Sequence, residues 1–219
     1  MKQTLKSIIR NVKSIKGNSL AEFATTTALM ATLAATAAPK LSEMSEGTKA
    51  EKSKNEIDKI LTQARNHYQD TADTEGRGRF PGQEKFDVPV GGYGTARSTQ
   101  ADAILKQTAL VTALGNWVDY DDAEGAKWRS VFGITEKMPA ASKVTNDIVD
   151  SDCDTCEDHI GHDEWLDRFG GNALTSQYQD GHFAYAVVPG GGSGTSAFPP
   201  VLYVVDIENA SNFNNVIEP

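Results

Sequence analysis

A run of sixteen uncharged residues near the amino terminus constrains this chain more than any other feature. From Phe23 to Ala38 it contains seven Ala, five Thr and four larger apolar residues, Phe23, Leu29, Met30 and Leu33. Such a run is only weakly apolar, and a stable membrane span usually needs about 20 mostly apolar residues. The composition therefore predicts a segment that is held in a bilayer for a time and is still able to leave it.

Charge is distributed unevenly around this run. The first seventeen residues hold five basic and no acidic side chains, which leaves 16 basic against 30 acidic side chains, a net charge of −14, for the rest of the chain. A basic start followed by an apolar run is typical of a segment whose beginning stays on the cytoplasmic side of a membrane. The acidic remainder repels phosphate backbones, so we expect no direct nucleic-acid partner.

One carboxylate, Glu22, stands at the start of the uncharged run. An isolated carboxylate at membrane depth costs a few kcal/mol, so in such a segment it usually has a partner or a role. The order Gly17-Asn18-Ser19-Leu20-Ala21-Glu22, followed by the uncharged run and Pro39, resembles the amino terminus of type IV prepilins. The family usually has Phe where Asn18 stands, and a run richer in Leu, Ile and Val.

The resemblance implies a processing reaction and an assembly role. A prepilin peptidase would cut after Gly17 and methylate the new amino terminus at Asn18. Glu22 would be the family's glutamate, pairing with the amino group of Asn18 on an adjacent subunit so that assembly relieves a desolvated charge. Pro39 lies where many pilins have a proline that bends the helix.

An ordinary secretory signal is the alternative interpretation of the amino terminus. The small residues Ala35-Thr36-Ala37 fit a conventional cleavage site, and the product would be a secreted soluble binding protein. The early carboxylate at Glu22 and the proximity of Pro39 to that site count against it.

Helical periodicity continues beyond Pro39. After a connecting segment containing Gly47, apolar residues recur at three- and four-residue intervals, which predicts one core-facing stripe on a charged helix: Ile57, Ile60, Leu61, Ala64 and Tyr68. We therefore expect a leader at 1–17, a long helix at 18–68 whose residues 18–38 lie in the membrane or the filament core, and a globular head at 69–219.

The head is predicted to be a small antiparallel sheet. Two segments rich in Val, Tyr and Phe, 182–188 and 201–207, read as strands, and the Gly-rich linker 190–196 between them suits a hairpin with a long loop. Residues 99–118 keep near-helical spacing, and 73–82 and 89–94 read as loops. The fold class is α+β, with a long N-terminal α-helix packed against the sheet, which is also what the pilin resemblance implies.

An acidic loop is predicted between residues 147 and 167, where nine acidic and no basic side chains occur. Crowded carboxylates repel one another unless they are solvated or bridged by a cation such as calcium. A solvated loop is the simpler expectation, and structural calcium at Asp150, Asp152, Asp154 and Asp158 is the alternative. An EF-hand is rejected because Thr155 stands where its glycine belongs.

The same loop holds the chain's two cysteines, Cys153 and Cys156. In an exported protein two nearby thiols tend to be oxidised, so we expect a disulfide that stiffens a short turn. With His159 and His162 they could also supply four zinc ligands, but this spacing is tighter than that of a zinc finger, so zinc is a weaker alternative than calcium.

No catalytic motif is present, so we expect no enzymatic activity. The resemblance implies a pilin, a structural subunit of a type IV pilus or related surface filament. Its partners would be identical subunits, the prepilin peptidase and the inner-membrane assembly machinery, and it would pass from the inner membrane to an extracellular filament. A pseudopilin of a type II secretion system is the alternative within the same superfamily, favoured if the acidic loop binds calcium.

Overall fold

A computed structural model describes residues 2–116, 124, 127–132, 161–178 and 183–219, with residues 2–19 described by their backbone alone. The chain divides into two compact units, residues 1–48 and residues 49–219. The second unit, the head, contains the sheet and the core.

Helix α1 runs over Lys2–Glu75 and includes Pro39 in its interior. It continues through Gly47, where we expected a connecting segment, and it extends beyond Tyr68 to Glu75. A glycine inside a helix costs only about 1 kcal/mol, and the residues around Gly47 are mostly good helix formers. Gly76 ends the helix with a left-handed φ of 80°, and its N–H donates to the Ala72 carbonyl.

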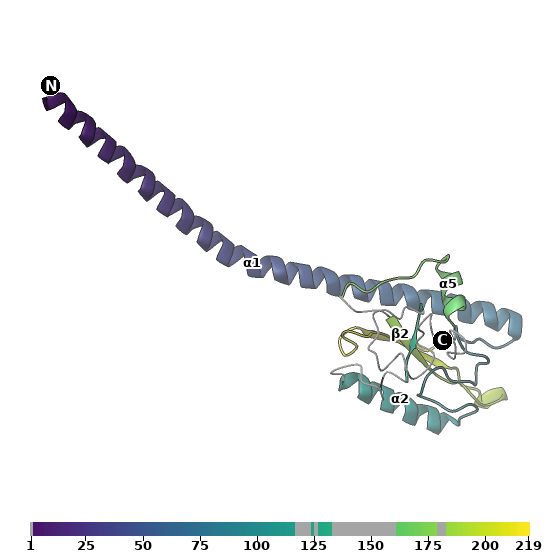
Figure 1. Ribbon diagram of the computed structural model, residues 1–219. Coiled ribbons are helices and arrows are strands. Elements are labelled where there is room, and N and C mark those ends of the chain that lie inside the picture. Colours follow the sequence, from purple (N-terminus) through teal and green to yellow (C-terminus); the bar gives the residue numbers. More distant parts are fainter. Residues whose placement is uncertain (1, 117–123, 125–126, 133–160, 179–182) are drawn as a thin grey trace, which may run out of the picture. The chain divides into compact units, whose positions relative to one another are not determined.

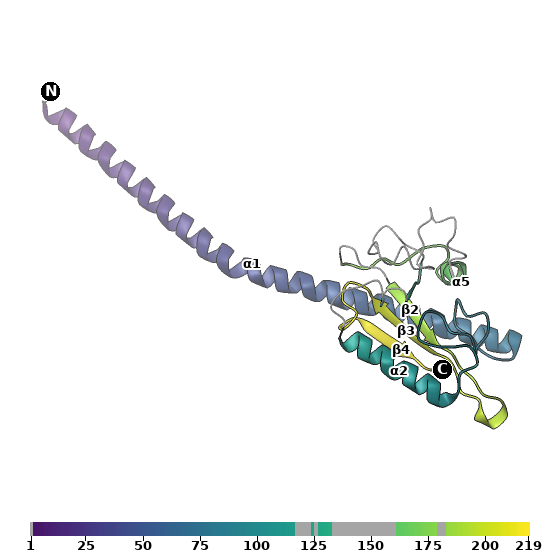
Figure 2. The same ribbon diagram turned by 60° about the horizontal axis from the view of Figure 1, so that its bottom comes forward.

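The head contains one four-stranded antiparallel sheet in the order β1-β2-β3-β4. The strands are β1 Arg129–Ser130, β2 Phe183–Val188, β3 Val201–Asp206 and β4 Asn214–Ile217. Strands β2 and β3 pair along their whole length, from Phe183 opposite Asp206 to Val188 opposite Val201. Figure 2 shows β2, β3 and β4 side by side. The two strands expected from the sequence are thus confirmed to within one residue at each end.

The two central strands are buried on both faces. One face packs on the last part of α1 through Tyr185, Val187, Leu202 and Val204. The other face packs on helix α2, Gln100–Gly115, through Ala184, Ala186, Val188, Val201, Tyr203 and Val205. In Figure 1 the sheet lies between the two helices. Two-sided burial explains why these strands are continuous apolar runs.

The expected α+β fold, a long N-terminal helix with a small antiparallel sheet, is confirmed. The stripe of α1 packs on the sheet as expected: Ile57, Ile60, Leu61 and Ala64 are between 0% and 8% exposed, and Tyr68 is partly buried. Helix α2 begins at the N-cap Thr99, whose hydroxyl accepts from the Asp102 N–H while the Asp102 carboxylate accepts from the Thr99 N–H. A short helix that the sequence did not predict, α5, occupies His162–Arg168.

The Gly-rich linker between β2 and β3 forms a defined turn. Gly191 and Phe198 exchange backbone hydrogen bonds of 3.1 and 3.0 Å, and a short 3-10 helix, η1, covers Gly194–Ser196. A Cβ at Gly192, where φ is 74°, would lie 2.1 Å from the Ser196 carbonyl oxygen. Glycine is therefore required here by the backbone path of the hairpin loop.

Candidate functional site

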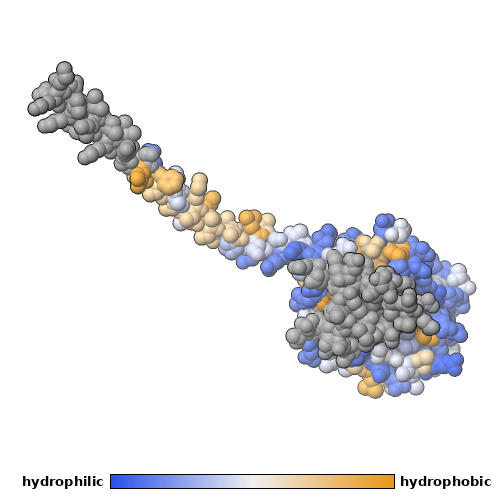
Figure 3. Space-filling view, in the orientation of Figure 1, coloured by the Kyte–Doolittle hydropathy of each residue, from blue (hydrophilic) through white to orange (hydrophobic). Residues whose placement is uncertain are grey.

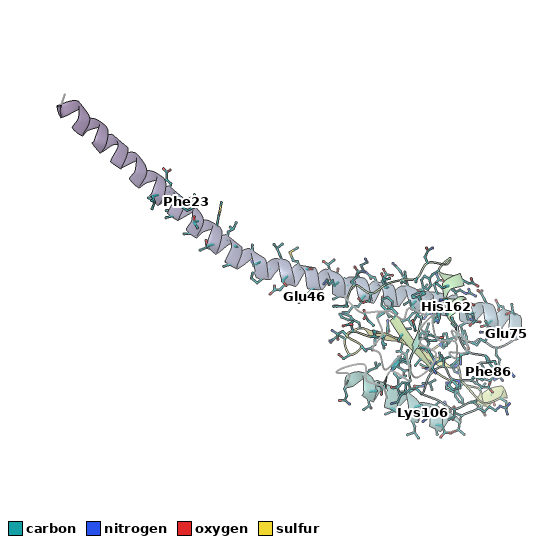
Figure 4. All side chains as sticks on the ribbon, viewed as in Figure 1. Phe23, Glu46, Glu75, Phe86, Lys106 and His162 are labelled. Carbon is teal, nitrogen blue, oxygen red and sulfur yellow. The ribbon has the colours of Figure 1, made fainter. Side chains whose placement is uncertain are left out.

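The candidate site is the part of α1 between Leu20 and Thr48, and its large apolar side chains are exposed. Phe23 and Met30 are each 72% exposed and Leu33 is 70% exposed, and Leu20, Leu29, Leu41 and Met44 are similarly open. Figure 3 shows hydrophobic colours over much of this segment, whereas the coloured part of the head is mostly hydrophilic. Figure 4 shows the Phe23 side chain extending away from the helix. An exposed apolar surface of this length marks a membrane or protein contact.

The threonines in this segment satisfy their own hydroxyl groups. Each of the five threonines in the uncharged run donates a hydrogen bond of between 2.7 and 3.1 Å to a backbone carbonyl three or four residues earlier: Thr25, Thr26, Thr27, Thr32 and Thr36. A hydroxyl with an internal partner can enter an apolar environment at small cost. The uncharged run from Phe23 to Ala38 can therefore be surrounded by lipid or by other helices without leaving hydroxyl donors unpaired.

Glu22 is the exception to this pattern. Its side chain is exposed, and only its backbone carbonyl is engaged, as the acceptor for Thr25 and Thr26. Among the residues whose side chains the structure describes, none pairs with the Glu22 carboxylate. Within residues 20–39 Glu22 is thus the polar side chain that still needs a partner.

The other expected processing and assembly residues also lie in α1. Gly17 and Asn18 belong to its helical backbone, and Pro39 lies in its interior. Because proline has no N–H, the Ala35 carbonyl loses the donor that an ordinary residue at position 39 would provide. The helix continues through this gap in its hydrogen-bond ladder.

Helix α1 from Leu20 onward is the one helix in the described part of the chain that is long and apolar enough to cross a membrane, and none of the qualifying window is buried. The core helix of a soluble protein would be mostly buried. A signal sequence near the amino terminus would pass the same test.

A buried polar network joins α1 to the sheet and was not predicted from the sequence. Asp206, at the end of β3, is 0% exposed. Its Oδ2 accepts from the Ser53 hydroxyl at 3.1 Å and from the Ser176 hydroxyl at 2.6 Å, and its Oδ1 accepts from the Glu208 N–H. Burial raises the pKa of Asp206, although these three hydrogen bonds oppose the shift. An Asp that ends an apolar strand was the available signal for such a network.

Charged side chains join α5 to the last turns of α1 and to the loop that follows α1. Arg79 Nη1 donates to Glu164 Oε1 at 2.7 Å, and Arg168 pairs with Asp70. Glu164 Oε2 accepts from the Gly82 N–H at 2.6 Å. The buried His67 lies beside them, with Nε2 3.9 Å from Glu164 Oε1.

The pKa of His67 follows from this environment. Burial is the largest cause that lowers the pKa of His67, and Glu164 opposes it; with the lowering effects of Arg168 and Arg79 and the raising effect of Asp70, the pKa is about 4. His67 is therefore neutral at pH 7, and we assign it to the core of the head.

The expected metal ligands and cysteines lie outside the described residues: Asp150, Asp152, Asp154, Asp158, Cys153, Cys156 and His159. His162 opens α5 and lies 3.0 Å from Asp163 through its Nδ1. Within the described ranges no group of three or more His, Cys, Asp or Glu side chains could hold a metal ion.

Comparison with models of known protein families, with curated proteins and with solved structures finds no match for this chain.

Proposed function

We propose that this chain is a structural subunit of a type IV pilus or a related surface filament, which polymerises through the amino-terminal part of α1. The observation that carries the proposal is the stretch of α1 over residues 20–39: exposed, apolar, with its threonine hydroxyls paired internally and with Glu22 as its one charged side chain. An ordinary signal sequence would share this exposure, but the early carboxylate at Glu22 and the proximity of Pro39 to the alternative cleavage site count against it.

Processing comes first. The basic residues before Gly17 hold the beginning of the chain on the cytoplasmic side, and the uncharged run holds the subunit in the inner membrane. A prepilin peptidase cuts after Gly17 and methylates Asn18, which leaves a positively charged amino group four residues before Glu22. The basic leader is thereby removed from the segment that must pack.

Assembly then follows from the chemistry of Glu22. In the membrane its carboxylate has no strong partner, whereas beside another subunit it meets the Asn18 amino group of that copy. Pairing two desolvated opposite charges relieves the cost that each carries alone. The assembly machinery of the inner membrane moves the subunit, and this pairing favours its arrival in the filament.

The composition of the run suits a helical core. Alanine and threonine let helix backbones approach closely, so packing between helices replaces contact with lipid. The gap in the hydrogen-bond ladder at Pro39 lets the helix adjust locally to its neighbours. In this function the head carries no catalytic role, and no nucleic acid is needed.

The test compares two carboxylates on the same helix. Glu22→Gln should reduce the yield of sheared surface fibres at least tenfold, while Glu46→Gln, an exposed position on α1 labelled in Figure 4, should leave it unchanged. Edman sequencing of the exported protein should find Asn18 at the amino terminus, and replacing Gly17 should leave a precursor about 1.8 kDa heavier, given the mean residue mass. An amino terminus at Ala38, or fibres that assemble equally well in the Glu22→Gln variant, would refute the proposal.

A further inference from the structure

The turn between β3 and β4 is held in place by three apolar side chains. Ile207, Ala210 and Phe213 are all buried in the core of the head. The Asn209 N–H donates to the Asp206 carbonyl at 3.2 Å, and the Phe213 N–H donates to the Asn209 carbonyl at 2.8 Å. The backbone of this turn is therefore fixed, and the polar side chains between the three apolar ones reach the surface.

Asn209, Ala210 and Ser211 in this turn form the tripeptide Asn-x-Ser, in which x is not proline. The sequence contains this pattern once and does not contain its threonine equivalent. In exported proteins it is the acceptor pattern for a glycan on the side-chain nitrogen of asparagine, and it lies in surface loops. Because so short a pattern also arises by chance, the state of the Asn209 side chain decides whether it can serve as an acceptor.

The amide oxygen of Asn209 is engaged in the turn, whereas its amide nitrogen is not. Oδ1 accepts from the Asn212 Nδ2 at 2.7 Å and from the Ser211 hydroxyl at 3.3 Å. Among the described residues none accepts from the Asn209 Nδ2, and this nitrogen is open to solvent. Since an amide nitrogen cannot accept, the two donors at Oδ1 fix the orientation of the amide and leave Nδ2 facing outward.

The other described asparagines that follow α1 differ from Asn209 in this respect. Each of them donates through its side-chain Nδ2 to an oxygen of the chain: Asn116, Asn172, Asn212, Asn214 and Asn215. Asn172 is the nearest match in sequence, because it is exposed and is also followed by alanine, but Leu174 stands where the hydroxyl would be. In this part of the chain the asparagine with the free nitrogen is therefore the one that the tripeptide marks.

We propose that Asn209 is a site of N-linked glycosylation, and that the sugar donor is an oligosaccharide carried on a polyisoprenyl pyrophosphate in the membrane. The Asn209 Nδ2 forms a bond with the anomeric carbon of the first sugar. The bond between that carbon and the phosphate oxygen breaks, and the lipid pyrophosphate leaves with the electron pair. Nδ2 gives one of its two protons to a base of the glycosyltransferase, so the transfer needs no oxidant or reductant.

The transfer requires that the head reach the outer side of the membrane. A subunit held in the membrane by α1 meets this condition, and the lipid-linked donor lies in the same membrane. A secreted soluble protein also meets it, so the inference goes beyond the proposed function and does not depend on polymerisation. The glycan adds a bulky polar group at the end of the β3–β4 hairpin, on the surface of the head.

The experiment is mass spectrometry of the mature full chain purified from its own host. The wild-type chain should exceed the mass of its polypeptide by one or more sugar residues, and fragment ions should place them on Asn209. Asn209→Gln should have the mass of the bare polypeptide, and so should Ser211→Ala, which leaves the acceptor in place. Ser211→Thr keeps the hydroxyl and should keep the glycan. Asn172→Gln, the matched control at the other Asn-Ala pair, should keep it as well.

Three results would overturn the inference: a mature wild-type chain with the mass of its bare polypeptide, a glycan that persists in the Ser211→Ala variant, or sugars attached to another residue. Ser211 is exposed, so the two Ser211 variants should be exported in equal amounts, and the comparison between them reads the hydroxyl alone. Fibres built from bare polypeptide overturn the glycosylation and leave the proposed function standing. Glycosylated chains that form no fibres do the reverse.

Discussion

Helix α1 contains two segments that differ in burial. Between residues 20 and 48 its apolar side chains cover several sides of the helix and stay exposed, with Met30 and Leu33 at 72% and 70%. Between residues 49 and 75 they form one stripe, and Ile60 and Ala64 are fully buried. A single stripe needs only one partner surface, and the sheet provides it. A helix that is apolar on several sides needs several partners, which one small head cannot supply.

The largest expected effect comes from placing the same charge in each segment. Ile60→Asp puts a carboxylate in the core and should cost about 3–5 kcal/mol, a large part of a typical domain's stability of about 5–15 kcal/mol. Leu33→Asp should leave the unfolding of the head unchanged. Denaturant titration of detergent-solubilised full chain, followed by fluorescence of the buried Trp128 and Trp165, measures both.

A Leu33→Asp variant as unstable as Ile60→Asp would remove the contrast, because it would show that the exposed segment also supports the head. Fibre yield should respond in the Leu33→Asp variant even though its head is intact.

The next largest expected effect is a pH dependence of the head's stability. It comes from residues 49–75, which include His67, because residues 20–48 contain no histidine. The pKa of His67 is about 4 in the folded head against 6.5 as its ordinary value. On lowering the pH, the unfolded chain binds its proton first, so stability is complete above pH 6.5 and is lost as the pH falls toward 4. The loss should amount to at most about 3 kcal/mol at 1.36 kcal/mol per pH unit. Denaturation midpoints at stepped pH should show this slope, and His67→Gln should remove it.

Asp206 should give the stability of the head a pH dependence opposite in sign to that of His67. Because burial raises its pKa, its protonation favours the folded state, so its contribution grows as the pH falls through the raised value. An Asp206→Asn variant should therefore lose stability more steeply in acid than the unmodified head. The reverse result would mean that Asp206 is ionised and held by its donors in the folded state.

The smallest expected effect compares two hydroxyls. Ser53→Ala removes one donor to the buried Asp206 and should cost about 1 kcal/mol. Thr32→Ala removes a hydroxyl that only donates to the Leu29 carbonyl of its own helix, and alanine is the better helix former, so the head should not respond. Equal shifts in the two unfolding curves would contradict the separation of α1 into an exposed and a packed segment.

Sequence patterns predicted those elements whose signal is local. The stripe at Ile57, Ile60, Leu61 and Ala64 repeats with the helical period, and the near-helical spacing of apolar residues in 99–118 predicted the helix that is α2. Strands β2 and β3 are rich in β-branched and aromatic residues. The position of α2 over the second face of the sheet was missed, although the unbroken apolar runs of β2 and β3 indicated two-sided burial.

Elements that depend on distant partners could not be predicted. Strand β4 contains two asparagines, which are depleted in strands, and it forms because β3 pairs with it from Leu202 to Val205. The contact between Arg79 and Glu164 joins residues 85 positions apart, and nothing in either neighbourhood specifies the other. For residues 20–48, the exposed apolar run and Glu22 were evident in the sequence, whereas the hydrogen bonds of the threonine hydroxyls depend on the geometry of the folded helix.

The packing of the apolar stripe of α1 on the sheet has a practical consequence for protein production. A soluble fragment that begins at residue 69 would lack Ile57, Ile60, Leu61 and Ala64, so one face of the sheet would be uncovered and the product would aggregate. A fragment that begins near Lys49, where the second compact unit begins, omits the exposed apolar segment and retains the side chains of α1 that pack on the sheet.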